Sequence, residues 1–170
     1  MSTPLTELLS GDTPDEHAEV WVRIAKAFEA RPHVPEAAEP LRTVAYLQSD
    51  LSEIPKIKFK GLGFFIASRR GRRCLTRLAD DLRACDLAEA AALVDQLPGI
   101  FNVSLEMLPT FVQVSQDAEA KWKEVRKLSD EMVKLPINER LWSAMQTNRE
   151  HLTGLIVPDP KRGFFAKLFG

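Results

Sequence analysis

The chain has no hydrophobic run long enough to cross a membrane as a helix. Apolar stretches such as residues 62–67 and 155–157 are far shorter than the roughly 20 residues that a spanning helix needs. A secretory signal is also missing, because Glu7 and Asp12 stand where a basic patch and an apolar stretch would be. We therefore expect a soluble, cytoplasmic protein.

Cysteine is scarce, and the two that occur are badly placed for a disulfide. Cys74 and Cys85 are 11 residues apart, and on one helix this separation would correspond to about 16 Å of rise, too far for a disulfide. Eight glycines and eleven prolines in 170 residues do not fit a collagen or linker composition, and 45% hydrophobic residues do not fit a disordered chain. This length and composition indicate one globular domain.

Acidic residues are missing from one long segment. Between Glu53 and Asp80 there is no Asp or Glu, although the whole chain has a net charge of only −1. The same segment contains eight basic residues, namely Lys56, Lys58, Lys60, Arg69, Arg70, Arg72, Arg73 and Arg77. The rest of the chain is therefore acidic, and this asymmetry points to an anionic partner.

Helical periodicity runs through nearly the whole sequence. It predicts helices over residues 13–31, 39–53, 63–84, 86–97, 110–134 and 137–157. Thr13-Pro14-Asp15-Glu16 and the pair Asp86 and Glu89 resemble capping boxes that begin the first and fourth helices. Prolines 32, 55, 98, 136 and 158 fall where these helices should end.

The apolar stretch 100–108 alternates like a strand, but a lone strand has no pairing partner. We interpret it as a buried helical turn or a short helix. The predicted fold is all-α, a compact bundle of about five to seven helices. We expect an N-terminal arm over residues 1–12, the helical domain over 13–157 and an amphipathic tail over 158–170.

The arginines of the basic segment form a stripe. On a continuous helix, Arg69, Arg73 and Arg77 would stack at intervals of four residues, and their mutual repulsion does not help the helix to form. They predict a binding face for lipid phosphates, nucleic acid or an acidic protein surface. The alternative is a structural or solvated face, neutralised by acids of a neighbouring helix such as Asp15, Glu16 and Glu19.

The C-terminal tail combines aromatic and basic residues. If it is helical, its apolar side chains cover one arc, and ordering the tail costs about as much as burying them gains. Stable anchoring therefore needs a second contact. The docking residues predicted for the tail are Lys161, Arg162, Phe164, Phe165, Lys167, Leu168 and Phe169.

The sequence Gly-Phe-Phe beside basic residues occurs at 63–65 and again at 163–165. Aromatic wedges next to cations are typical of an interfacial membrane contact. The alternatives are that Phe64 and Phe65 are core residues and the tail packs on the domain or a second subunit. A nucleic-acid binder would instead use Phe59, Phe64 and Phe65 to stack bases.

Catalytic and metal-binding patterns are missing. His17, His33 and His151 are not at metal-ligand spacing, and Gly61-Leu-Gly63 is too short for a phosphate loop. We interpret the two cysteines as core residues, although a thiolate at Cys74 would be favoured by the arginines around it. No metal, cofactor, small-molecule substrate or enzymatic activity is expected.

These features predict a non-enzymatic adaptor or regulator. It would dock through the eight basic residues and the tail to an anionic membrane surface, a protein partner or both, and it would reach the inner membrane face as a peripheral protein. A protein–protein module that self-associates or binds another protein, without a membrane role, is one alternative. A nucleic-acid-binding regulator is the other.

Overall fold

The structure is a computed structural model that describes residues 2–52, 61–110 and 119–160. Its described helices are α1 (Leu5–Leu8), α2 (Val20–Ala30), α3 (Glu39–Ser52), α4 (Leu62–Ala67), α5 (Arg69–Cys74), α6 (Leu78–Ala84), α7 (Ala88–Val94), α8 (Leu97–Phe101), α10 (Glu119–Met132) and α11 (Ile137–Thr147). Short 3-10 helices are η1 (Glu36–Ala38), η2 (Leu75–Arg77) and η3 (Arg149–Leu152). The predicted all-α fold is confirmed.

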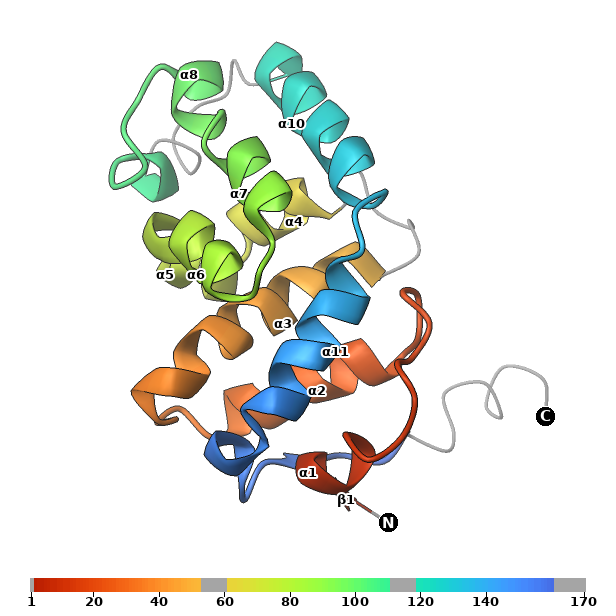
Figure 1. Cartoon of the computed structure of the whole chain (residues 1–170). Helices are drawn as coiled ribbons and strands as arrows, with labels where there is room; N and C mark the ends of the chain where they lie inside the picture. The colour runs from red at the N-terminus through yellow and green to blue at the C-terminus, as the bar shows by residue number, and fades with distance from the viewer. Residues whose placement is uncertain (1, 53–60, 111–118, 161–170) are drawn as a thin grey trace, which may run out of the picture.

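Helix α3 lies in the middle of the bundle. It packs against α2, α6, α11 and α4, and nearly all of its residues are buried. Figure 1 shows α2 and α11 on one side of α3 and α4 to α8 on the other, with α10 covering α7 and α8 at the far end. The core is continuous across these elements, since its buried side chains form one cluster from Leu5 to Val157.

The predicted helix 63–84 is not continuous, and this interpretation was wrong. Ser68 takes an extended conformation (φ −73°, ψ 152°) and separates α4 from α5. Its hydroxyl accepts a hydrogen bond from the Gly71 amide at 2.9 Å, so Ser68 caps α5. The chain then passes through η2 into α6. The interruption lets α5 fold back until a Cβ built on Gly71 would lie 1.8 Å from the carbonyl oxygen of Phe65.

Both predicted capping boxes are wrong. Helix α2 begins at Val20, not near Thr13, because the Asp15 carboxylate accepts a hydrogen bond from the His17 amide (2.9 Å) and holds a turn there. Asp86 adopts a left-handed φ of 59° and its carboxylate pairs with Arg140 at 2.6 Å, so α7 begins after Leu87 without a side-chain cap.

A small strand pair ties the two ends of the described chain together. β1 (Thr3–Pro4) pairs antiparallel with β2 (Ile156–Val157), in the register Thr3 with Val157. The helix predicted over residues 137–157 was therefore wrong for its last part, since α11 ends at Thr147 and Ile156–Val157 is a strand. The segment expected as an arm contributes Leu5 and Leu9 to the core, with exposed fractions of 0% and 2%.

Pro98 and Gly99 do not end a helix as predicted. They lie inside α8, which ends at Phe101 where Asn102 takes a left-handed φ of 55°. Of the ambiguous stretch 100–108, Phe101 and Leu108 are buried whereas Met107 is exposed. Within the described ranges, we find no helix with the length and apolar character that a bilayer crossing requires.

Candidate functional site: an arginine pocket

The candidate site is an open pocket of about 770 Å³ between α2, α3 and the segment α4–η2. We call it the arginine pocket. Six basic side chains line it, namely Lys26, Arg42, Arg69, Arg70, Arg73 and Arg77. Glu29 is the one carboxylate among its described lining residues. Two helices besides the basic segment therefore contribute cations, Lys26 from α2 and Arg42 from α3.

Arg70 is one of the partly enclosed cations, with 21% of its side chain exposed. Its guanidinium hydrogen-bonds to the Asp50 carboxylate, which is fully buried, and to Ser49 Oγ at 3.3 Å. It also lies over the Tyr46 ring, with Cζ 5.4 Å from the ring centroid. Burial is the largest single influence on the pKa of Arg70 and lowers it, but the Asp50 and Glu29 carboxylates together outweigh burial and the net shift is upward. Arg70 is therefore a fixed cation in the wall of the pocket.

Arg77 is held in a second ion-pair cluster. Its Nη2 lies 2.5 Å from Glu39 Oε2 and 3.1 Å from Thr43 Oγ1, and its Nε lies 3.1 Å from Asp81 Oδ2. Glu39 also accepts from Arg42 at 2.5 Å. These contacts join η2 and α6 to the first turns of α3. Burial is the largest influence on the pKa of Asp81 and raises it, although Thr43 and Arg77 act in the opposite direction.

Internal acids therefore neutralise part of the predicted binding face, as the structural alternative proposed. The predicted acids were the wrong ones: Asp15, Glu16 and Glu19 do not pair with the arginines, and Glu29, Glu39, Asp50 and Asp81 do. The prediction used charge alone, and charge does not show that α3 lies against the basic segment.

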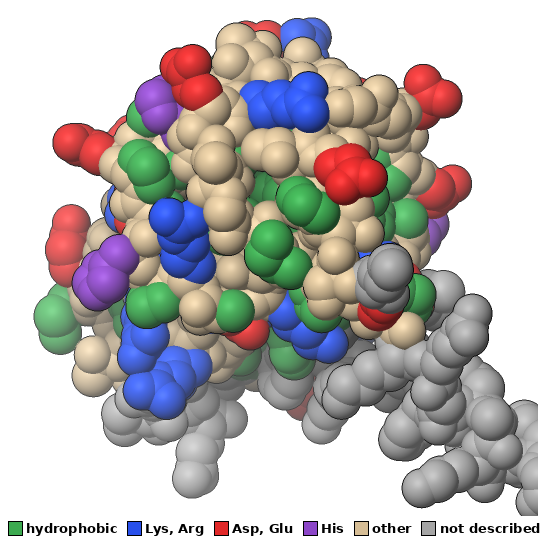
Figure 2. Space-filling view, turned by 90° about the horizontal axis from the view of Figure 1, so that it is seen from below, with side chains coloured by type: hydrophobic (Ala, Val, Ile, Leu, Met, Phe, Trp, Pro, Cys, Tyr) green, Lys and Arg blue, Asp and Glu red, His purple; other side chains and the backbone are tan. Residues whose placement is uncertain are grey.

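Three cations in the pocket differ from Arg70 and Arg77 in their exposure and in their lack of a described ion-pair partner. Lys26, Arg69 and Arg73 are exposed, and none of them makes a side-chain hydrogen bond or ion pair with another residue of the described ranges. Arg72 is half-buried and is not among the lining residues. Figure 2 shows, for contrast, a face on which basic, acidic and hydrophobic side chains are interspersed. The unneutralised positive charge at the pocket is thus carried by Lys26, Arg69 and Arg73.

The pocket also has an apolar wall. Val22, Pro32 and Phe64 line it beside the cations, and Phe64 is half-buried whereas Phe65 is fully buried. The two phenylalanines of the first Gly-Phe-Phe therefore have different surroundings. Phe65 is a core residue, and Phe64 lines the candidate site.

Several predicted site residues lie outside the described residues. They are Lys56, Lys58 and Lys60 of the basic segment and the tail residues Lys161, Arg162, Phe164, Phe165, Lys167, Leu168 and Phe169. Conversely, the sequence analysis missed Lys26, Arg42 and Tyr46 as parts of the site. The spacing of Arg42 and Tyr46, four residues apart on α3, places them on one helix face, but only the packing of α3 brings that face to the arginines.

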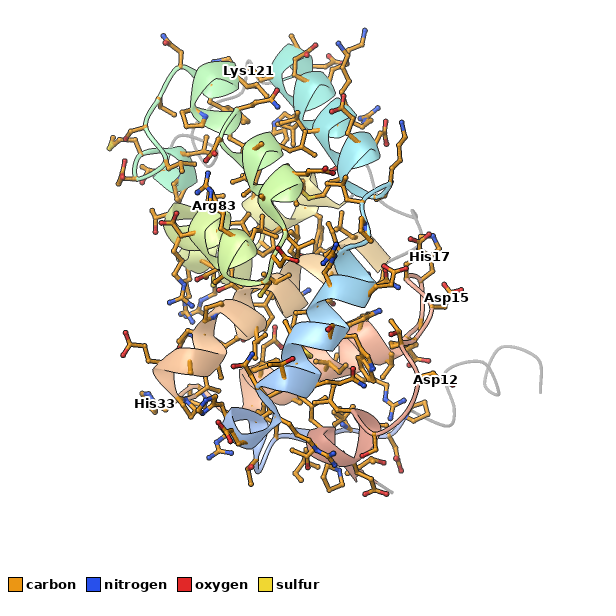
Figure 3. All side chains as sticks on the ribbon, viewed as in Figure 1. Asp12, Asp15, His17, His33, Arg83 and Lys121 are labelled. Atoms are coloured by element: carbon orange, nitrogen blue, oxygen red, sulfur yellow. The ribbon has the colours of Figure 1, made fainter. Side chains whose placement is uncertain are left out.

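The described residues do not form a metal site. No group of three or more His, Cys, Asp or Glu side chains among them is arranged to hold an ion. Figure 3 shows His17 and His33 on opposite sides of the molecule, and His17 lies beside Asp15 on the segment that precedes α2. His17 Nε2 is 3.3 Å from Glu16 at the exposed surface.

The cysteines are buried, as predicted for core residues, and the alternative of a thiolate at Cys74 is not favoured. Burial raises the pKa of Cys74 and outweighs the opposing effects of Thr43, Arg77 and Arg42. Burial likewise raises the pKa of Cys85 to about 12. Cys74 and Cys85 are exposed by 5% and 3%, so both behave as small core residues.

These raised pKa values predict a loss of stability in alkali. A thiol with a higher pKa in the folded state stabilises the fold below its unfolded pKa, and this contribution disappears as the pH rises through the folded value. Between pH 8.5 and 10.5 we expect the wild type to lose about 1–2 kcal/mol more than Cys85→Ala. Urea unfolding at both pH values measures the difference. Equal losses in the two proteins would show that Cys85 titrates normally in the fold.

Comparison with family models, with curated proteins and with solved structures finds no match to this chain.

Proposed function

We propose that this protein is a non-enzymatic helical adaptor that docks on anionic groups through the arginine pocket. One observation carries the proposal: six basic side chains from α2, α3 and the segment α4–η2 line one open pocket, against a single carboxylate among its described lining residues. Arginine is suited to phosphate and carboxylate groups, because its planar guanidinium donates two parallel hydrogen bonds. The surplus charge of Lys26, Arg69 and Arg73 is available to such a group.

The partner that we favour is the anionic surface of a membrane. Each basic residue near such a surface contributes about 1 kcal/mol, and the half-buried Phe64 beside the arginines adds an apolar contact. The tail, with three phenylalanines and Leu168 among basic residues, would supply a second weak contact. Stable anchoring needs two such contacts.

Vesicle binding tests this proposal. We expect the full chain to sediment with vesicles containing anionic lipid at low salt and to stay in solution with neutral vesicles. Replacing two exposed cations in Arg69→Gln/Arg73→Gln should weaken binding about thirtyfold, because two contributions of about 1 kcal/mol are removed. The matched control is Lys123→Gln/Arg126→Gln, which removes the same charge from exposed residues of α10.

A truncation separates the contribution of the tail. Stopping after Pro160 keeps the Val157 pairing and the hydrogen bond from Arg23 Nε to the Pro158 carbonyl (2.5 Å), so the domain should remain folded. We expect weaker but measurable vesicle binding. Failure of both lengths of chain to bind anionic vesicles at low salt would leave the membrane proposal without support. Binding to a protein or nucleic acid would then be tested in its place.

A further inference from the structure

Glu29 is the carboxylate that meets Arg70 at the solvent side of the arginine pocket. Its Oε1 lies 3.1 Å from Nη1 of Arg70. The Glu29 side chain is 46% exposed, whereas Asp50, the other acid on Arg70, is 0% exposed. Arg70 thus has one permanent internal partner and one partner at the solvent side.

Arg70 does not need Glu29 to keep its place. Asp50, Ser49 and the Tyr46 ring hold the guanidinium from the interior. The Glu29 side of the Arg70–Glu29 pair is exposed to solvent, and solvent screening keeps the contribution of such a pair to stability small. An incoming oxyanion therefore displaces the Glu29 carboxylate at small cost and takes over its hydrogen bond from Nη1.

The charge of the ligand decides whether this exchange is favourable. A group of charge −1 gains little when it replaces a carboxylate that is already tethered in the pocket. A phosphomonoester carries about −1.5 to −2 at pH 7 and offers three acceptor oxygens. It can hold Arg70 and also draw in Arg69 and Arg73, which form no described ion pair. A phosphodiester has one charge and fewer free oxygens.

The size and the wall of the pocket indicate more than a bare phosphate ion. A volume of about 770 Å³ lies within the range of pockets that take small organic ligands. Val22, Pro32 and Phe64 line the pocket beside the cations, where they can contact the apolar part of such a molecule.

We infer that the arginine pocket selects a phosphomonoester attached to an organic group, and that Glu29 is a built-in competitor that sets this selectivity. This inference rests on the proposed function. The phosphomonoester can belong to a lipid headgroup or to a soluble phosphorylated molecule, since the chemistry recognised is the same.

The test compares monoester and diester ligands on the full chain. Vesicles with phosphatidic acid present a monoester, and vesicles with phosphatidylglycerol at equal surface charge present a diester. Glycerol 3-phosphate, measured by calorimetry, is the soluble monoester. The variants are Glu29→Gln and, as a control of equal charge change, Glu89→Gln on α7, a helix that contributes no lining residue.

We expect wild type to prefer the monoester vesicles. Glu29→Gln should bind the monoester about five- to tenfold more tightly, because one negative charge close to the ligand is removed. Glu29→Gln should also bind the diester vesicles measurably, which wild type binds only weakly, whereas Glu89→Gln should change either affinity by less than about twofold. Glu29→Ala removes the same charge and serves if Glu29→Gln fails to fold. Binding of glycerol 3-phosphate identifies a soluble ligand, and binding to phosphatidic acid vesicles alone identifies a lipid.

Two negative results are distinguishable. If no variant binds any anionic vesicle or glycerol 3-phosphate, the proposed function itself is wrong. If wild type binds both vesicle types equally and Glu29→Gln behaves like Glu89→Gln, docking on anions stands but selection of a phosphomonoester by Glu29 is overturned.

Discussion

Replacing Arg70 with methionine is expected to lower the free energy of unfolding by about 3–5 kcal/mol, because the substitution leaves a buried carboxylate without its counter-ion. The Asp50 side chain is 0% exposed and is hydrogen-bonded by the Arg70 guanidinium. Methionine keeps much of the volume of the arginine stem, so the loss measures charge and hydrogen bonding more than packing. Urea unfolding monitored by circular dichroism gives the difference.

The neighbouring arginine is the matched control. Arg69 is exposed and lies beside Arg70 in the chain, so Arg69→Met should change stability by no more than about 0.5 kcal/mol. A double variant, Asp50→Leu with Arg70→Met, removes both charges and should recover much of the loss. If Arg70→Met is as stable as Arg69→Met, the buried pair does not support the fold in the way described.

Gly71→Ala is expected to destabilise the protein by about 3 kcal/mol. An added Cβ would meet the Phe65 carbonyl oxygen at 1.8 Å and its carbon at 2.6 Å, so the backbone of α4 or α5 must move. Overpacking of this kind costs about 1–3 kcal/mol or more, and the gain in helix propensity from alanine offsets less than about 1 kcal/mol of it. Thermal unfolding measures the result.

Gly99→Ala is the control for this effect. Gly99 also lies in a helix, α8, but its added Cβ would meet nothing within 4 Å. Alanine should therefore leave stability unchanged or raise it by as much as about 1 kcal/mol. Equal effects of the two substitutions would mean that α5 does not approach Phe65 as closely as described.

Regular helices were predictable from the sequence where the helical spacing of apolar residues agrees with the positions of the prolines that end helices. The prediction for α3 over 39–53 closely matches Glu39–Ser52, because apolar residues recur on one face and Pro55 follows. The break at Ser68 was not predictable in this way. Residues 63–84 keep a helical period throughout, whereas Ser68 takes an extended conformation and caps α5, so that Gly71 approaches the Phe65 carbonyl.

The candidate site, too, was only partly predictable from the sequence. Arg69, Arg70, Arg73 and Arg77 were predicted from the missing acids, and all four line the pocket. Charge counting along the chain could not show which of them are neutralised, because Asp50 and Glu39 come from α3 and meet the arginines only after folding. It also missed Lys26, which reaches the pocket from α2.

The pairing of β1 with β2 has a consequence for synthesis on the ribosome. The Leu5 amide donates to the Leu155 carbonyl at 2.8 Å, and Thr3 of β1 pairs with Val157 of β2. A chain that emerges from its N-terminus therefore carries Leu5 and Leu9 without their final partners until almost all of the described domain has been made. Docking of the first helix is thus a late event, and a nascent chain halted before residue 155 would leave these leucines open to chaperones.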